Sequence, residues 1–231
     1  MKIVFTPDWF LQGDILIEII SFAILVLFFY FCRKNYKLSG KKSILYLGVG
    51  FLLIALAEIS TIITKFVLYY DTTFVQEIGR MIVTYNVTHS VDIFYYIGFF
   101  FHKIFTLLGF FIIYKIPMKK GSSRDLILTL YFILVAALFS QGFYYLFHLT
   151  ATGLLILIIS NYYSIYSKNK SENTFLLITA FSGLALSQII AVLSPLNVLY
   201  VISQGLQLVS YLILLILIIR ITKYGREKKS N

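Results

Sequence analysis

The chain has 231 residues, of which 59% are hydrophobic and only 13% are charged, and its mean hydropathy is +0.87. Soluble domains carry roughly 25% charged residues, so this composition excludes an ordinary soluble protein and indicates a single membrane domain over residues 1–231. The formal net charge of +10 needs no nucleic-acid partner, because basic loops that orient membrane helices account for it.

Seven apolar runs follow one another along the chain. Each is near the roughly 20 residues that an α-helix needs to cross the hydrocarbon core. The runs are continuous and do not alternate in polarity, which predicts helices. We expect spans at Ile15–Phe31, Ser43–Leu68, Ile93–Tyr114, Leu126–Ser140, Phe143–Tyr166, Thr174–Leu193 and Val198–Ile221. The fourth span is the shortest, and its boundary with the fifth at Gln141 and Gly142 is the least defined, so an interpretation that merges or drops it stays open.

Basic residues gather in the connections after spans one, three, five and seven. These connections hold every lysine and arginine except Lys2, Lys65, Arg80 and Lys103. The opposite connections are mainly acidic and contain Asp8, Asp14, Asp71, Glu77 and Asp92. By the positive-inside rule the basic side is cytoplasmic. The N-terminus is therefore predicted outside, and the C-terminus in the cytoplasm, of a multi-pass protein of the cell membrane.

Part of the chain repeats when it is shifted by 130 residues. Phe51–Ile59 then falls on Phe181–Ile189 without a gap, and Glu58 meets Gln188. Tyr36 falls on Tyr166, and the stretch 107–110 in span three resembles 208–211 in span seven. The match predicts a 3-1-3 plan of two parallel repeats, residues 14–116 and 143–223, joined by a linker helix at 125–140.

This layout resembles that of the SWEET-type sugar transporters and, more distantly, that of microbial rhodopsins. The resemblance implies a transporter-like protein with its substrate site where the repeats meet. It stops at layout, because SWEET-type helices carry prolines in corresponding spans, whereas Pro7, Pro117 and Pro195 lie outside the predicted helices. A rhodopsin needs a retinal-binding lysine in the seventh span, and 198–219 has none.

The segments Gly50–Leu56 and Phe181–Ser187, each after a short basic loop, also resemble uncharacterised archaeal seven-helix integral membrane proteins. That resemblance implies no activity.

Polar side chains recur inside the predicted spans, where they usually face the bundle interior or a water-filled cavity. On four helices they follow stripes at helical spacing and gather toward the outer half. We therefore predict an outward-facing cavity whose ligand-binding residues are Glu58, His102, Lys103, His148, Gln188, Gln204 and Gln207. The alternative is a dry bundle in which these groups only hydrogen-bond one helix to another.

Charge pairing is predicted from depth. Lys103 lies about 15 Å from either surface, too deep for easy snorkelling. We expect it to pair with Glu58, with Glu18 as the alternative partner. Lys65, near the outer end of span two, is expected to snorkel to the interface and to need no functional role.

The outer connection between spans two and three is the longest. Thr73 and Gln76 form a capping-box pattern, and apolar residues from Val75 to Tyr85 follow at helical spacing. This pattern predicts a short amphipathic helix on the outer surface. Asn86 begins a glycosylation sequon in the same outer connection.

No catalytic residue is predicted, and no nucleotide-binding or hydrolase motif occurs in the sequence. No cofactor or metal is expected. His102 and His148 are the alternative axial ligands of a haem b, and with Glu58 they are an alternative three-ligand metal site.

The leading function is transport or sensing of a small polar ligand by a protein that is not an enzyme. The alternatives are a haem-bearing redox membrane subunit and a structural or assembly subunit of a membrane complex. A homo-oligomer or a partner membrane subunit fits each of them. No nucleic-acid partner is expected beside the lipid bilayer.

Overall fold

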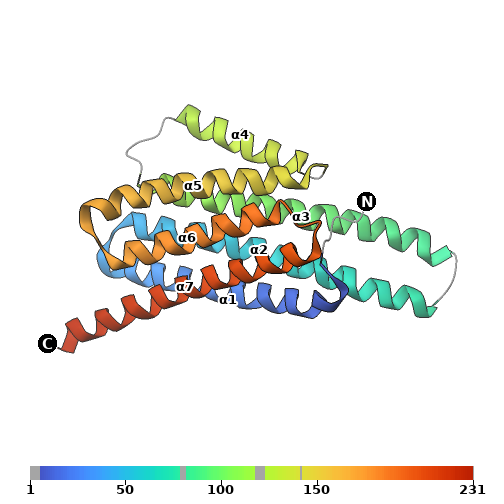
Figure 1. Ribbon diagram of the computed structural model, residues 1–231, viewed down its shortest axis with the longest axis horizontal. Helices are drawn as coiled ribbons and strands as arrows, with labels where there is room; N and C mark the ends of the chain where they lie inside the picture. Colours follow the sequence, from blue (N-terminus) through green and yellow to red (C-terminus); the bar gives the residue numbers. More distant parts are fainter. Residues whose placement is uncertain (1–5, 79–81, 118–122, 141, 231) are drawn as a thin grey trace.

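The computed structural model describes residues 6–78, 82–117, 123–140 and 142–230, and describes their side chains except at 8, 11, 68–94, 123–125 and 222–230. These residues form α-helices and no strand, as predicted, after a short 3-10 helix at Asp8–Phe10 (Figure 1). The helices are α1 (Leu11–Ser39), α2 (Lys42–Ile78), α3 (Ile82–Lys115), α4 (Ser123–Phe139), α5 (Tyr144–Asn169), α6 (Glu172–Ala191) and α7 (Asn197–Ser230).

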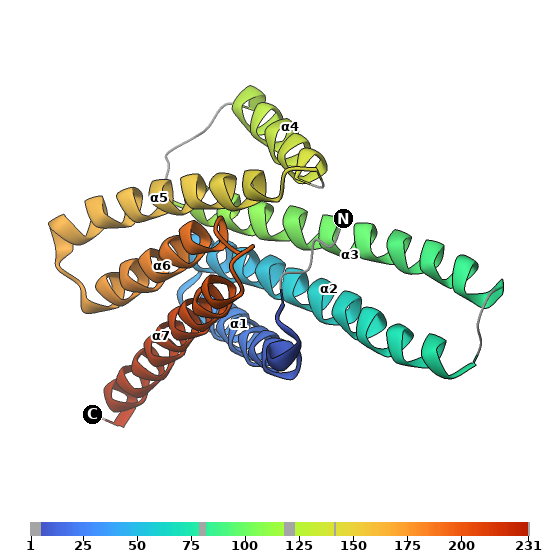
Figure 2. The same ribbon diagram turned by 45° about the vertical axis from the view of Figure 1, so that its right-hand side comes forward.

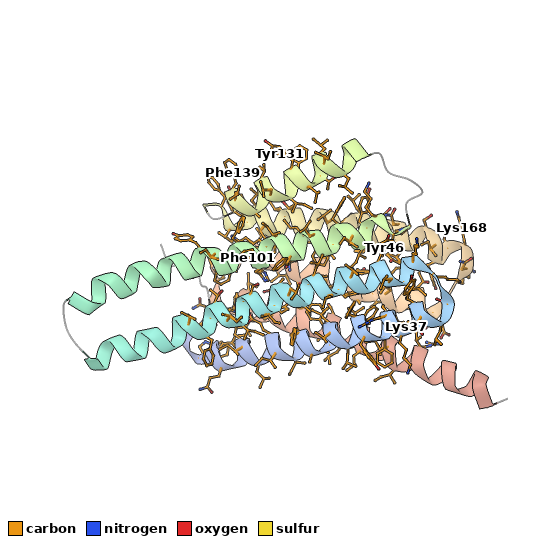
Figure 3. The ribbon with its side chains drawn as sticks, turned by 180° about the vertical axis from the view of Figure 1, so that it is seen from behind. Lys37, Tyr46, Phe101, Tyr131, Phe139 and Lys168 are labelled. Atoms are coloured by element: carbon orange, nitrogen blue, oxygen red, sulfur yellow. The ribbon has the colours of Figure 1, made fainter. Side chains whose placement is uncertain are left out.

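Within the described ranges, six of these helices are long and apolar enough to cross a membrane, namely α1, α2, α3, α5, α6 and α7. This confirms the multi-pass membrane class. Helix α4 has 17 residues and is apolar but shorter, as its sequence predicted. It lies on the outside of the bundle against α3 and α5 (Figures 1 and 2). Its large side chains, including those of Tyr131 and Phe139, are mostly exposed (Figure 3).

The other six helices pack as two groups of three that contact each other. Helix α2 packs between α1 and α3, and α6 packs between α5 and α7. Contacts of α1 with α7 and of α3 with α5 join the two groups. The connection from α1 to α2 and the connection from α5 to α6 share one end of the bundle, where Figure 3 shows Lys37 and Lys168. We call this the basic end.

Helices α2 and α3 continue as a pair beyond the other helices at the opposite end (Figure 2). The predicted short surface helix is therefore wrong, because Thr73 lies within α2 and Tyr85 lies within α3. From 68 to 78 the sequence has no glycine or proline to end α2, so its periodic apolar residues extend a long helix instead. Asn86 belongs to α3 and not to a loop, and its side chain lies outside the described set.

The ends of α1 and α5 have the same geometry, 130 residues apart. Gly40 follows α1 with φ +66°, and its N–H donates to the carbonyl of Tyr36. Lys170 follows α5 with φ +44°, and its N–H donates to the carbonyl of Tyr166. These left-handed caps are the two positive-φ residues in the described part of the chain. Glycine adopts this conformation without cost, and Lys170 adopts it despite its Cβ.

The apolar core lies toward the basic end. Phe51, Phe181, Leu155, Ile158 and Leu214 are almost fully buried there, on α2, α6, α5 and α7. Close-packed apolar side chains leave little room for water. The core therefore closes the bundle on this side.

Two close helix crossings support this core. A Cβ added at Gly109 would lie 2.7 Å from the carbonyl oxygen of Gly50, so α2 and α3 meet backbone to backbone. At the crossing of α6 with α7, a Cβ added at Gly183 would collide with the side chain of Ser210. Small residues permit such close approach of membrane helices.

Candidate functional site

Two adjoining cavities lie on the other side of this core, away from the basic end. The outer one has a volume of about 140 Å³ and the inner one about 60 Å³. Side chains from α3, α5, α6 and α7 line both and form the wall between them: His102, Phe147, His148, Ala191 and Ser203. A cavity of this size with several polar groups has room for ordered water or a small ligand.

Five of the seven predicted ligand-binding residues line the inner cavity: Glu58, His102, His148, Gln188 and Gln207. Lys103 lines the outer cavity instead. Gln204 lines neither, and its Oε1 atom is buried without a hydrogen-bond partner. The structure thus brings most of the predicted cluster to one place, although the residues come from α2, α3, α5, α6 and α7.

Glu58 is buried on α2 and faces α7. Its Oε1 accepts hydrogen bonds from Gln207 at 2.9 Å and from the hydroxyl of Tyr211 at 3.3 Å. Because a carboxylate in a membrane interior is costly without such donors, these two bonds stabilise it in place. Its exposed fraction of 3% shows that bulk water does not reach it.

The two histidines are each oriented through Nδ1. In His148 this atom lies 2.7 Å from Oε1 of Gln188, and a carboxamide oxygen only accepts, so Nδ1 donates. The Nε2 atom of the neutral ring is then left as an acceptor. In His102, Nδ1 lies 2.7 Å from the hydroxyl of Thr61 and 3.2 Å from the carbonyl of Ala57. Nε2 is thus the nitrogen of each ring that remains for a ligand.

The alternative haem site meets an obstacle in Phe147. The ring of Phe147 lies 5.6 Å from that of His102 and 5.1 Å from that of His148, measured between centroids. A haem held by both histidines would have to displace this ring. It would also exceed the two cavities, since even drug-sized ligands occupy roughly 300–1,000 Å³. Among the described side chains, no three His, Cys, Asp or Glu residues lie close enough to hold a metal ion.

A buried ion cluster, which the sequence did not predict, lies beside the outer cavity. The ammonium of Lys65 contacts Asp14 at 2.5 Å and also pairs with Glu18. The hydroxyl of Tyr200 lies 3.3 Å from this ammonium and donates to Asp14 at 2.8 Å. Thr6 donates a further hydrogen bond to Asp14 at 2.9 Å. These four residues and Thr6 form what we call the Lys65 cluster.

The expectation that Lys65 snorkels is wrong, because its side chain is only 3% exposed. The misassignment came from Asp14, which the predicted boundary left in a loop. Helix α1 starts at Leu11 instead of Ile15, so Asp14 lies in its first turn. Asp14 and Glu18 are then one helical turn apart on the same face. That i, i+4 spacing of acids was the available signal.

The predicted pair of Glu58 and Lys103 is not formed. Lys103 donates to the backbone carbonyl of Ser140 at 3.0 Å, in the connection from α4 to α5. Glu58 faces α7 instead, and the alternative partner Glu18 pairs with Lys65. The prediction was made from depth along each helix, whereas the rotation of each helix about its axis decided the partners.

The outer cavity combines cationic, aromatic and hydroxyl side chains. Its described lining holds two lysines, two histidines and no acid: Thr61, Lys65, Tyr95, Tyr96, Phe99, His102, Lys103, Tyr144, Phe147, His148, Ala191, Ser194, Tyr200 and Ser203. The inner cavity shares the two histidines, but its described lining adds an acid, Glu58, and two glutamines and has no lysine.

In comparisons with known proteins, no family model, no curated protein and no solved structure matches the chain.

Proposed function

We propose that this chain is a membrane protein that binds a small polar ligand, for transport or sensing, in the two adjoining cavities. The main support for this proposal is the wall that the two cavities share. His102 and His148 present groups to both cavities, so a ligand that enters the outer one meets the polar groups around Glu58 in the inner one. Polar groups gathered around a cavity in this way are typical of ligand sites.

The orientation is part of the same proposal. The basic end is cytoplasmic by the positive-inside rule, so the cavities face outward. The buried apolar core around Phe51 and Phe181 then separates them from the cytoplasm. A transporter must open this core during its cycle, whereas a sensor need only respond to the bound ligand.

We further propose that residues 14–116 and 143–223 are duplicated halves joined by α4. The matching caps at Gly40 and Lys170 support this, as does the start of α2 at Lys42 and of α6 at Glu172. The buried faces also correspond. In α1 they include Leu25, Phe28 and Cys32, and in α5 they include Leu155, Ile158 and Tyr162.

The contacts between the halves follow the pattern of a two-fold relationship. If α1 corresponds to α5 and α3 to α7, then the packing of α1 on α7 corresponds to that of α5 on α3, and both occur. Matched positions line the inner cavity in three pairs: Ile54 with Leu184, Glu58 with Gln188, and Phe110 with Tyr211. Transporters built from parallel repeats place their substrate site at such an interface.

Thiol labelling tests the cavity directly. Single cysteines at Ser203 and Gln188, in a background in which Cys32 is replaced by serine, should react with a small membrane-impermeant thiol reagent added from outside. Cysteines at the neighbouring positions Ile202 and Ile189, which are 44% and 49% exposed on the lipid side of the same helices, should not. The neighbours control for helix, depth and expression.

Equal reactivity of cavity and lipid-side cysteines would contradict the proposed site. Unreactive cysteines at both cavity positions would favour the dry bundle, in which polar groups serve only helix packing. A screen of small polar compounds for thermal stabilisation complements the labelling, because a ligand that binds only the folded protein raises its melting temperature.

A further inference from the structure

The two lysines of the outer cavity differ in how their charge is balanced. Lys65 has three N–H groups and three oxygen partners, those of Asp14, Glu18 and Tyr200. Two of these partners are acids, so the charge of Lys65 is balanced within the protein. No N–H group of Lys65 is therefore left to donate to a ligand.

Lys103 has one neutral partner, the carbonyl of Ser140 at 3.0 Å. In the described part of the chain, no carboxylate pairs with it. Its side chain is half-buried and lines the outer cavity, with N–H groups left for a further acceptor. An ammonium at this depth is costly without a counter-ion, and an anionic ligand would provide one.

The rest of the outer cavity favours an anion with an apolar body. No acid occurs in its described lining, while Tyr95, Phe99 and Phe147 form aromatic walls. The rings of Tyr95 and Phe99 pack with centroids 4.7 Å apart. A cavity of roughly 150 Å³ accommodates a benzene ring, close to the volume of about 140 Å³ here.

We infer that the outer cavity binds a small organic carboxylate with a ring-sized apolar body, and that Lys103 binds its carboxylate. This inference rests on the proposed function and names the ligand class of the same site. The ammonium of Lys103 donates to the carboxylate oxygens, and the aromatic walls cover the apolar body. Inorganic anions such as phosphate satisfy the ammonium but leave the aromatic walls without a partner.

Benzoate is the probe that tests this, with the full-length protein purified in detergent. Benzoate should raise the melting temperature more than its neutral isostere benzamide, its cationic counterpart benzylamine, or inorganic phosphate at equal concentration. Lys103→Gln should raise the benzoate concentration needed for half-maximal stabilisation by about 10- to 100-fold, as expected for loss of a hydrogen bond to a charged group.

Two further variants separate binding from folding. Lys103→Arg retains the charge and should retain a preference for benzoate over benzamide. Lys115→Gln removes a lysine from the basic end of the same helix, outside both cavities, and should leave the response to benzoate unchanged. If Lys103→Gln fails to fold, loss of the benzoate preference from Lys103→Arg would still overturn the inference.

The outcomes distinguish the ligand class from the proposed function. Equal stabilisation by benzoate and benzamide, or an unchanged response of Lys103→Gln, would overturn the role of Lys103 as a carboxylate-binding residue. A rise in melting temperature with phosphate equal to that with benzoate would contradict the claim that the ligand has an apolar body. No response to benzoate while the cysteine at Ser203 reacts with the thiol reagent would overturn the carboxylate assignment alone. No response together with unreactive cavity cysteines would overturn the proposed function as well.

Discussion

Phe51 and Phe181 lie 130 positions apart in the sequence and stack on one another in the core, with ring centroids 6.1 Å apart and ring planes within 7° of parallel. One comes from α2 and the other from α6. Residues that correspond under a two-fold relationship meet only close to its axis. The stacked pair therefore lies close to the axis that would relate the two proposed halves of the chain.

This stacking predicts an energetic coupling between the two rings. Phe51→Leu and Phe181→Leu should each destabilise the protein, and the double variant should lose less than the sum, with a coupling of about 0.5–1.5 kcal/mol. Thermal unfolding of the four proteins in one detergent measures it. Phe51→Leu combined with Phe101→Leu is the control, since Phe101 is exposed and should give additive losses.

The Lys65 cluster should be sensitive to loss of its cation. Lys65→Met leaves Asp14 and Glu18 buried without a counter-ion, and the expected loss of stability is roughly 3–5 kcal/mol. Combining it with Asp14→Asn and Glu18→Gln should recover much of that loss, because no buried charge then remains unpaired. Lys168→Met, at an exposed lysine, should change stability by less than about 0.5 kcal/mol. A triple variant that is less stable than Lys65→Met would contradict the pairing.

Glu58 should depend on its hydrogen bonds more than on its charge. Glu58→Gln keeps an acceptor for Gln207 and Tyr211, and gives α2 the residue that α6 has at Gln188. We expect it to fold with a loss below about 1 kcal/mol. Glu58→Leu leaves both donors unpaired, which should cost about 1–3 kcal/mol more. Melting temperatures of the two variants decide this, and equal values would show that the hydrogen bonds contribute little.

The crossing of α2 with α3 should tolerate no side chain at Gly109. In Gly109→Ala the new Cβ would collide with the backbone of Gly50, so the helices must separate, at an expected cost of about 1–3 kcal/mol. Gly153→Ala and Gly205→Ala are matched controls, because no atom lies within 4 Å of either new Cβ. They should be neutral or stabilising by up to about 1 kcal/mol through helix propensity. A neutral Gly109→Ala would argue against the close crossing.

The predicted orientation is open to a reporter test. A reporter fused after Asn231 should be active in the cytoplasm, and one inserted in the connection between α2 and α3 should be exported. An active cytoplasmic reporter in that connection would reverse the orientation. The cavities would then face the cytoplasm, and the thiol reagent would have to be supplied from that side.

Hydropathy and charge were sufficient to predict the class of this protein and the position of its helices along the chain. Burial of an apolar run of about 20 residues in lipid is a local property that needs no knowledge of neighbouring helices. The left-handed cap at Gly40 is likewise a local feature, because glycine adopts this conformation without cost. The proposed repeat also comes from the sequence, because positions 130 residues apart such as Phe51 and Phe181 carry the same side chain.

The ends of the helices were less predictable. Helix α1 gained a turn that places Asp14 inside the bundle, and α2 and α3 continue past the expected surface loop. Hydropathy marks where lipid begins and not where a helix stops, since a helix continues into water until a glycine, proline or cap ends it.

The partners inside the bundle were decided by the tertiary structure alone. The sequence analysis predicted an ion pair between Glu58 and Lys103. In the structure Lys65 pairs with Asp14 and Glu18 instead, and Lys103 lines the outer cavity. Depth in the membrane follows from position along a helix at about 1.5 Å per residue. Which helices are neighbours, and how each is rotated about its own axis, depends on the packing of the whole core, and no single segment of sequence contains that information.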